Sequence, residues 1–164
     1  MGLHGQKKPF LAWYAMLQAN TRLTERINAE LEAEAGIPLS WFEVLAKLSW
    51  APESCARMGA LADDLLLSRG GTTRLIARME EAGLVRREVP VHDRRATYAH
   101  VTEKGQAVLD RAAPVHMAKV EEYFQQHLSE EEVEVLARAM GKVLRGLGAD
   151  DDWVLADLEA AAPQ

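Results

Sequence analysis

The chain has little that would support disulfide, membrane or secretory chemistry. It contains one cysteine, Cys55, in 164 residues, which excludes an internal disulfide and favours a reducing compartment. Its longest apolar run, Phe10–Leu17, has eight residues, whereas a membrane-spanning helix needs about 20. The first ten residues also lack the apolar stretch of a signal peptide. We therefore expect a cytoplasmic protein with no membrane partner.

The patterns that mark catalytic and metal sites are also missing from the sequence. No glycine-rich phosphate loop follows a predicted strand, no nucleophile elbow occurs, and no carboxylate pair is placed by a defined fold. The five histidines have no short ligand spacing, and none pairs with Cys55 in sequence. We therefore expect no enzymatic activity, no metal and no cofactor.

Positive charge is scarce overall but is concentrated in one segment. The formal net charge is −6, yet residues 69–95 hold seven arginines against four acidic residues. That segment therefore carries +3, and the rest of the chain carries −9. Such a distribution repels phosphate everywhere except at the basic segment, which would orient the protein on nucleic acid. From charge alone, an ordinary solvated basic surface is the alternative.

Residues 58–105 carry the most specific pattern in the chain. They open with a short predicted helix whose apolar residues recur at i, i+3, i+4 and i+7. A second predicted helix can be capped by Ser68, buries Ile76 and Met79, and ends at Gly83 in the left-handed conformation. Two helices joined by a short turn form the geometry in which the second helix enters a DNA major groove.

A predicted hairpin follows the two helices. Its β-rich runs are Leu84–Val89 and Ala96–Val101, and a basic tip lies between them at residues 92–95. A hairpin tipped with arginine can reach a narrow minor groove. Together these elements predict a winged helix-turn-helix, in a fold that is mainly α with a small β-wing.

Five short motifs, in this order and spacing, carry a resemblance to a known family. They are Leu61-Ala62, Thr73-Arg74-Leu75-Ile76, Glu81–Arg87, Asp93-Arg94-Arg95 and Val101–Gly105. With long predicted helices before and after, the chain resembles the MarR family of bacterial regulators. The resemblance implies a homodimer that binds a pseudo-palindromic operator in double-stranded DNA. It also implies that the protein usually represses and that a small effector releases it.

The candidate DNA-binding residues lie on the second helix and at the hairpin tip. They are Arg69, Thr73, Arg74, Arg78, Arg94 and Arg95. Arg74 can reach guanine or a phosphate from one turn into the helix, and Arg69 is expected to touch phosphate. For Arg78, an ion pair with Glu81 is an equal alternative. The resemblance gives Asp93 the role of shaping the tip.

The segments that flank the winged domain predict long helices with apolar stripes. One helix is expected from Pro9 to about residue 35, and a capping box at residues 40–43 is expected to open the next. Thr102 can cap a helix that runs to about His127, and a second capping box begins at Ser129. We expect dimerisation segments at 1–36 and 105–164 around a DNA-binding domain at 37–104, because these stripes lack a partner within the winged domain.

Three residues are candidates for an effector pocket: Trp13, Trp41 and His116. In the family that the chain resembles, effectors bind in a crevice between the dimer helices and the winged domain. Tryptophans there could stack on an aromatic compound, and His116 could bind an anionic group. Ordinary core packing is the alternative for all three residues.

Two further functions stay open. Cys55 could sense oxidants, although Arg57 is its only nearby cation and a reactive thiol requires stabilisation of its thiolate form. The winged domain could instead serve as an adaptor for protein contacts. An adaptor would not need arginines on both the second helix and the hairpin tip.

Overall fold

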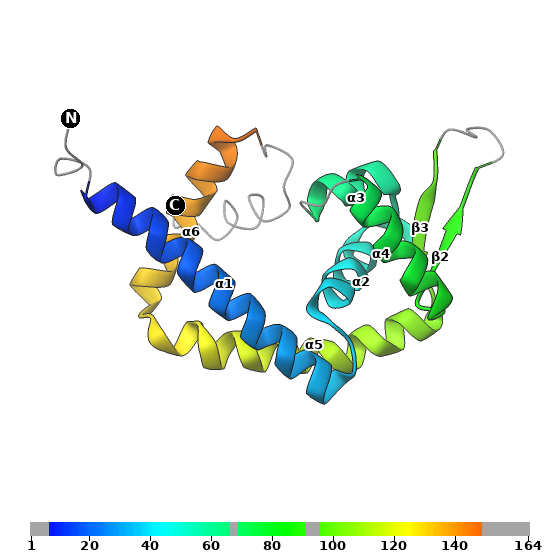
Figure 1. Ribbon diagram of the computed structural model, residues 1–164, viewed down its shortest axis with the longest axis horizontal. Coiled ribbons are helices and arrows are strands. Elements are labelled where there is room, and N and C mark those ends of the chain that lie inside the picture. The colour runs from blue at the N-terminus through cyan, green and yellow to red at the C-terminus, as the bar shows by residue number, and fades with distance from the viewer. Residues whose placement is uncertain (1–6, 66–68, 91–95, 149–164) are drawn as a thin grey trace. The chain divides into compact units, whose positions relative to one another are not determined.

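The computed structural model describes residues 7–65, 69–90 and 96–148, and these are mainly helical with a small antiparallel sheet, as predicted (Figure 1). They divide into two compact units, Met1–Lys119 and Val120–Gln164. The helices are α1 (Lys7–Ala35), α2 (Leu39–Trp50), α3 (Met58–Asp64), α4 (Arg69–Glu81), α5 (Glu103–Tyr123) and α6 (Glu130–Gly146), with short 3-10 turns at Pro52–Ser54 and Gln125–His127. The strands are β1 (Cys55–Arg57), β2 (Val85–Glu88) and β3 (Tyr98–Val101).

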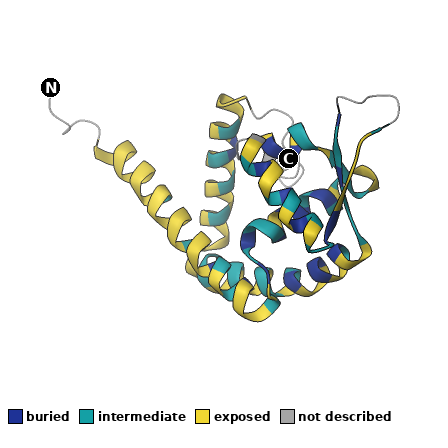
Figure 2. Ribbon diagram, turned by 45° about the vertical axis from the view of Figure 1, so that its right-hand side comes forward, coloured by how far each residue is buried: buried dark blue, intermediate teal, exposed yellow. Residues whose placement is uncertain are grey.

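The core of the first unit lies among α2, α3, α4 and the sheet, where buried residues gather (Figure 2). The large side chains that are fully buried there are Leu31, Leu45, Leu48, Leu61, Ile76, Met79, Val44 and Val85. Helix α1 contributes only Ile27 and Leu31 to the buried set, both from its C-terminal half. The longer part of α1 is exposed in the single chain.

The sheet has three strands in the order β1-β3-β2, and both pairings are antiparallel. The two strands of the predicted hairpin are confirmed as β2 and β3. The third strand, β1, was missed by the sequence analysis, because three residues are too few to show an alternating pattern. Its pairing of Cys55 with His100 and of Arg57 with Tyr98 joins the segment before α3 to the hairpin.

The end of α4 and the start of α5 are joined by a dense set of hydrogen bonds. Gly83 has φ 73°, and the Leu84 N–H donates to the Met79 carbonyl at 2.9 Å, which closes α4 as the sequence predicted. The Thr102 hydroxyl accepts from the Gly105 N–H at 3.0 Å and donates to the Gly83 carbonyl at 2.7 Å. Thr102 therefore caps α5 and fixes it to the end of α4.

The start of α2 differs from the predicted capping box. The helix begins at Leu39, and its N-cap residue, Pro38, makes no side-chain capping bond. Instead, the Leu39 N–H donates to Oδ1 of Asn28 on α1 at 2.9 Å. The prediction of a cap at Ser40 was wrong because a side chain from another helix satisfies the first donor, and local sequence does not report such a contact.

Helices α5 and α6 otherwise follow the predicted pattern. Helix α5 ends at Tyr123, before the predicted end near His127. The capping box at Ser129 is confirmed by reciprocal hydrogen bonds with Glu132. Within the described part of the chain, no helix combines the length and apolar character that crossing a membrane requires.

Gly105 allows α5 to approach the turn before β2, which leads to a prediction. A Cβ at this position would lie 2.0 Å from the Leu84 carbonyl oxygen. Gly105→Ala should therefore lower the free energy of unfolding by about 1–3 kcal/mol or more, since backbone must move to admit the methyl group. Gly59→Ala is the matched control, because nothing lies within 4 Å of its added Cβ. Urea unfolding would check this, and equal effects of the two variants would contradict it.

Candidate nucleic-acid interface

Helix α4 has one buried and one exposed side, as its sequence predicted. Thr72, Ile76 and Met79 are buried at spacings of four and three residues. Thr73, Arg74 and Arg78 are exposed. Because the buried side is packed against the core, the orientation of the exposed side relative to the rest of the first unit is fixed.

The two arginines in the middle of α4 are not neutralised by described neighbours. Among the residues that the structure describes, neither Arg74 nor Arg78 forms an ion pair. The alternative pairing of Arg78 with Glu81 is therefore not formed. A Cβ at Gly70 would lie 3.7 Å from Nη1 of Arg74, so this guanidinium extends over the first turn of α4. Both charges are available to an external anion on this side.

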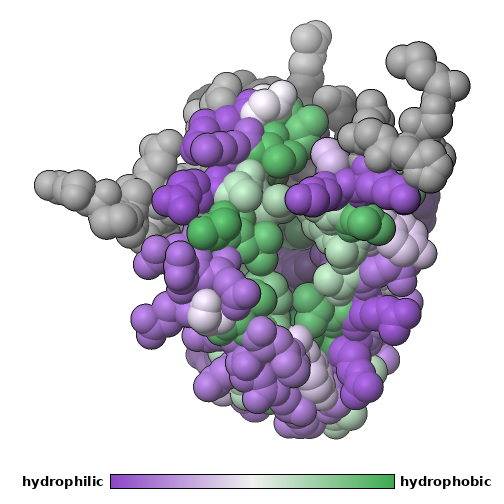
Figure 3. Space-filling model, turned by 90° about the vertical axis from the view of Figure 1, so that its left-hand side faces the viewer, coloured by the Kyte–Doolittle hydropathy of each residue, from purple (hydrophilic) through white to green (hydrophobic). Residues whose placement is uncertain are grey.

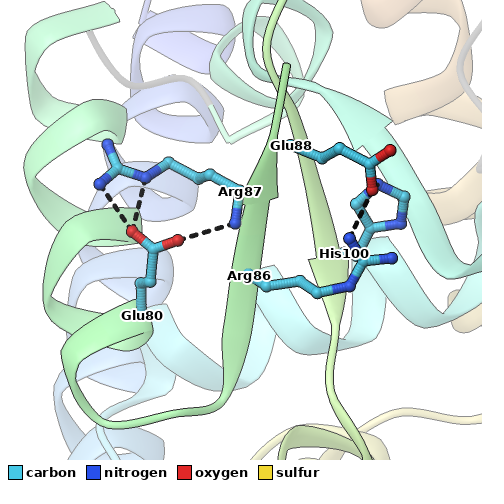
Figure 4. Close-up of polar contacts among 5 residues, drawn as sticks. All are labelled: Glu80, Arg86, Arg87, Glu88 and His100. Atoms are coloured by element: carbon cyan, nitrogen blue, oxygen red, sulfur yellow. Dashed lines mark hydrogen bonds and ion pairs between the residues drawn. The ribbon is translucent and has the colours of Figure 1, made fainter. Parts of the chain in front are cut away.

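The two arginines of β2 are paired within the chain. Arg86 pairs with Glu88 on the same strand, and Glu88 also lies 3.5 Å from Nε2 of His100 (Figure 4). Arg87 pairs with Glu80 of α4, whose Oε2 lies 2.6 Å from Nη2 of Arg87. The pairing of Arg87 with Glu80 could not be predicted from the sequence, because a contact across a turn from helix to strand has no periodic signal.

Several predicted contact residues lie outside the described part of the structure. These are Arg94 and Arg95 at the hairpin tip. Asp93, predicted to shape the tip, and Ser68, predicted to cap α4, also lie outside the described part. Arg69 is the first residue of α4, but its side chain is not among those described. Their assigned roles in DNA contact and in shaping the tip stay predictions.

The three predicted effector residues lie on three different helices. Trp13 on α1 has 54% of its surface exposed, and Trp41 on α2 is half-buried. His116 on α5 stacks on Phe42 of α2, with ring centroids 4.3 Å apart. Trp13 precedes the first buried residue of α1, Ile27, by 14 residues, which is about 21 Å along a helix. Within the first unit, the structure therefore brings His116 against α2 but records no ring contact for either tryptophan.

Cys55 is half-buried on β1, directly opposite His100 on β3. Among the described residues, no group of three or more His, Cys, Asp or Glu side chains could hold a metal ion.

Comparison with known proteins extends the likeness over most of the chain. The model of the MarR family matches residues 35–96. MhqR of Bacillus subtilis, an HTH-type transcriptional regulator, is 37% identical over 89 residues, which span 54% of this chain and 59% of MhqR. AbsC of Streptomyces coelicolor, a MarR family transcriptional regulator, is 32% identical, with a TM-score of 0.79 over 85% of this chain and 94% of AbsC.

Sco3205, a MarR family transcriptional regulator from Streptomyces coelicolor, was crystallised in complex with DNA. It is 33% identical to this chain, with a TM-score of 0.78 over 84% of this chain and 86% of Sco3205. The chain belongs to the MarR family. It is a DNA-binding transcriptional regulator with a winged helix-turn-helix. By the naming convention of that fold, the second helix of the pair, α4, is called the recognition helix, and β2 and β3 are called the wing strands.

The environment of His116 in this MarR-family chain predicts a pH dependence of stability. Burial lowers the pKa of His116 below its ordinary value of 6.5, so the unfolded chain binds a proton more readily than the folded one. Stability should therefore fall as the pH decreases from about 7.5 through 6.5, and level off below the folded pKa. His116→Phe keeps a ring against Phe42 but cannot titrate.

The measurement is the melting temperature between pH 7.5 and 5.5 for wild type and His116→Phe. The variant should lose less stability over this range than the wild type. His127→Gln, at an exposed position in the second unit, is the control and should retain the wild-type pH dependence. Parallel curves for wild type and His116→Phe would refute the assignment.

Proposed function

We propose that this MarR-family chain is a homodimeric repressor that binds a pseudo-palindromic operator and is released by a small aromatic effector. The observation that carries the DNA-binding part is the exposed side of α4. There, Thr73, Arg74 and Arg78 project from a helix whose other side is fully buried. A helix held in this way can present the same side chains to base edges in every complex.

The charge distribution supports the same part of the proposal. Because Arg86 and Arg87 are engaged with Glu88 and Glu80, the basic residues most available in the described segment are Arg74 and Arg78. Arg74 can form two hydrogen bonds with guanine or contact a phosphate, and Arg69, Arg94 and Arg95 would add contacts to the backbone or minor groove. The crystal structure of Sco3205 with DNA supports this use of the fold.

The homodimer rests on apolar side chains that the single chain leaves exposed. Helix α1 exposes Phe10, Leu11, Trp13, Tyr14 and Leu17. Helix α6, in the second unit, exposes Val135, Leu136 and Val143, and the exposed Leu147 follows directly after it. Figure 3 shows hydrophobic side chains on one exposed face. Exposed apolar surface of this kind marks interaction sites, and a second copy presents matching stripes.

Replacing Arg74 tests the recognition helix. Operator sequence would first be obtained by selecting bound DNA from a random pool, which also gives the half-site spacing. Arg74→Ala should weaken operator binding in a gel shift by about 1–3 kcal/mol, or roughly 5- to 150-fold, and relax sequence choice if it reads a base. If it contacts only phosphate, the loss should be similar on all sequences.

Arg111→Ala is the matched control for Arg74→Ala. Arg111 is exposed on α5 and donates to the Ala107 carbonyl of its own helix at 3.0 Å, so its loss removes the same charge away from α4. Equal losses of operator affinity in the two variants would mean that only the total charge of the protein matters, and this would contradict the assignment of α4. The bound complex should contain two chains per operator, and one chain per operator would contradict the homodimer.

Titration with phenolic acids and related aromatic compounds tests the effector. We propose that such a compound binds near Trp13, Trp41 and His116 and favours a dimer whose recognition helices are wrongly spaced for DNA. It should quench tryptophan fluorescence and weaken operator binding by about 5- to 150-fold. Trp13→Phe and Trp41→Phe should each reduce the quenching, whereas Trp50→Phe, at an exposed position, should not. Loss of DNA binding that depends on an oxidant and Cys55 would favour the redox alternative instead.

A further inference from the structure

The two arginines of β2 point to opposite faces of the sheet and serve different contacts (Figure 4). Arg86 lies on the face that carries Glu88 and His100, so its ion pair stays within the sheet. Arg87 lies on the face turned toward α4, where it meets Glu80. Only the second of these ion pairs joins a wing strand to the recognition helix.

Three donor–acceptor contacts fix the position of Arg87 relative to the carboxylate of Glu80. Nε of Arg87 donates to Oε2 of Glu80 at 2.7 Å, and Nη2 lies 2.6 Å from the same oxygen. The backbone N–H of Arg87 donates to Oε1 at 2.8 Å. One carboxylate therefore holds both the side chain and the main chain of the strand residue, and such charge-assisted bonds are short and directional.

The position of this contact allows it to set the angle between β2 and α4. Glu80 is in the last turn of α4, and Arg87 is the third residue of β2, beyond the turn at Gly83. The turn alone fixes where β2 starts, whereas a second fixed point along the strand also fixes its tilt against the helix. The Arg87 hydrogen bonds keep the pKa of Glu80 below its ordinary value, so its carboxylate is charged at neutral pH.

We propose that Glu80 is a positioning residue that sets the angle between the recognition helix and the wing strands, so that both engage one DNA duplex together. The inference rests on the proposed use of α4 and the wing to contact DNA. In this role Glu80 itself touches no DNA. Its negative charge on a DNA-binding element is tolerated because Arg87 neutralises it.

Electrostatics and positioning predict opposite results for Glu80→Gln. Removing an acid near DNA should strengthen binding if charge alone matters. If Glu80 positions the wing, the variant should weaken operator binding by about 2- to 30-fold, the range for a residue that acts on a site without touching the ligand. The probe is the selected operator duplex at fixed salt, with affinity measured by fluorescence anisotropy.

Two acids serve as matched controls. Glu81→Gln removes the same charge from the neighbouring exposed position of α4. Glu88→Gln removes the acid of the ion pair that stays within the sheet. Both should leave operator affinity unchanged or increase it. Arg87→Lys keeps the positive charge but loses the fork geometry, so it should weaken binding as Glu80→Gln does.

A hydroxyl-radical footprint separates positioning from loss of fold. Glu80→Gln should lose protection in the minor grooves that flank each half-site and keep protection around the major groove read by α4. Its melting temperature should stay within a few degrees of wild type, since the pair is one-third exposed. A footprint and an affinity equal to those of wild type, or binding as strong as that of Glu81→Gln, would overturn the proposal.

The same experiment distinguishes failure of this inference from failure of the proposed function. If wild type protects the flanking minor grooves and Glu80→Gln protects them equally, only the positioning role fails. If wild type protects no flanking groove, the wing does not contact DNA, and both the positioning role and the proposed wing contact fail. Operator binding by Arg74→Ala then tests separately whether the recognition helix contacts DNA.

Discussion

The contact of Gly105 with the Leu84 carbonyl is the constraint on which the DNA-binding unit depends. It brings the end of α4, the start of β2 and the start of α5 to one point. The Thr102 hydroxyl reinforces this junction by capping α5 and binding the Gly83 carbonyl. Lys104 adds a bond from its ammonium to the Ala82 carbonyl at 2.7 Å, where the helix dipole favours a cation.

Because of this junction, α4 cannot tilt without displacing the start of α5. A packed set of backbone hydrogen bonds resists gradual deformation and moves as a block. The position of the recognition helix α4 is therefore tied to the position of α5. A ligand that shifts α5 where His116 stacks on Phe42 of α2 would act on the same packed block.

The arginines of the basic segment are divided by the fold into two functional groups. Arg86 forms an ion pair with Glu88, and Arg87 forms an ion pair with Glu80. Both contacts help to hold the wing strands in place. Arg74 and Arg78 lie on the exposed side of α4 and form no ion pair among the described residues. The paired arginines of the segment therefore lie on β2, and the two that form no described ion pair lie on α4.

Most of the fold could be predicted from the sequence, because its determinants are local. Periodic apolar residues located α4, Gly83 located its end, and Thr102 and Ser129 located the starts of two helices. The missed features all depend on contacts between different helices and strands, which local patterns do not report. Asn28 caps α2 from another helix, β1 pairs with β3 across more than 40 residues, and Glu80 reaches Arg87 across a turn.

The candidate site was predictable only in part, for the same physical reason. The exposed side of α4 follows from helical periodicity, so Thr73, Arg74 and Arg78 could be assigned to it. Whether an exposed arginine is paired depends on tertiary contacts, and the sequence could not separate Arg87 from Arg78. The effector residues depend on packing between helices and, under the proposed function, between subunits, which no single-chain pattern encodes.

Under the proposed function, the exposed half of α1 would link dimer formation to the effector response. In the single chain, a helix of 29 residues buries only Ile27 and Leu31. Trp13 belongs to the exposed apolar stretch that the proposed second copy would cover. A ligand that binds beside Trp13 would then contact an interface, so its affinity would depend on how the two subunits are placed.

In the proposed dimer, the placement of the subunits would also set the separation of the two α4 helices, because each α4 is fixed to its own α5 by the junction at Gly105. The affinity for the ligand and the affinity for DNA would therefore both depend on the geometry of the dimer. Linkage requires that a ligand which prefers one geometry weakens DNA that prefers the other, by the same factor in both directions. Under the proposed function, effector control thus requires a rigid DNA-binding unit. With a flexible junction, a change in the placement of the subunits would not be passed on to α4.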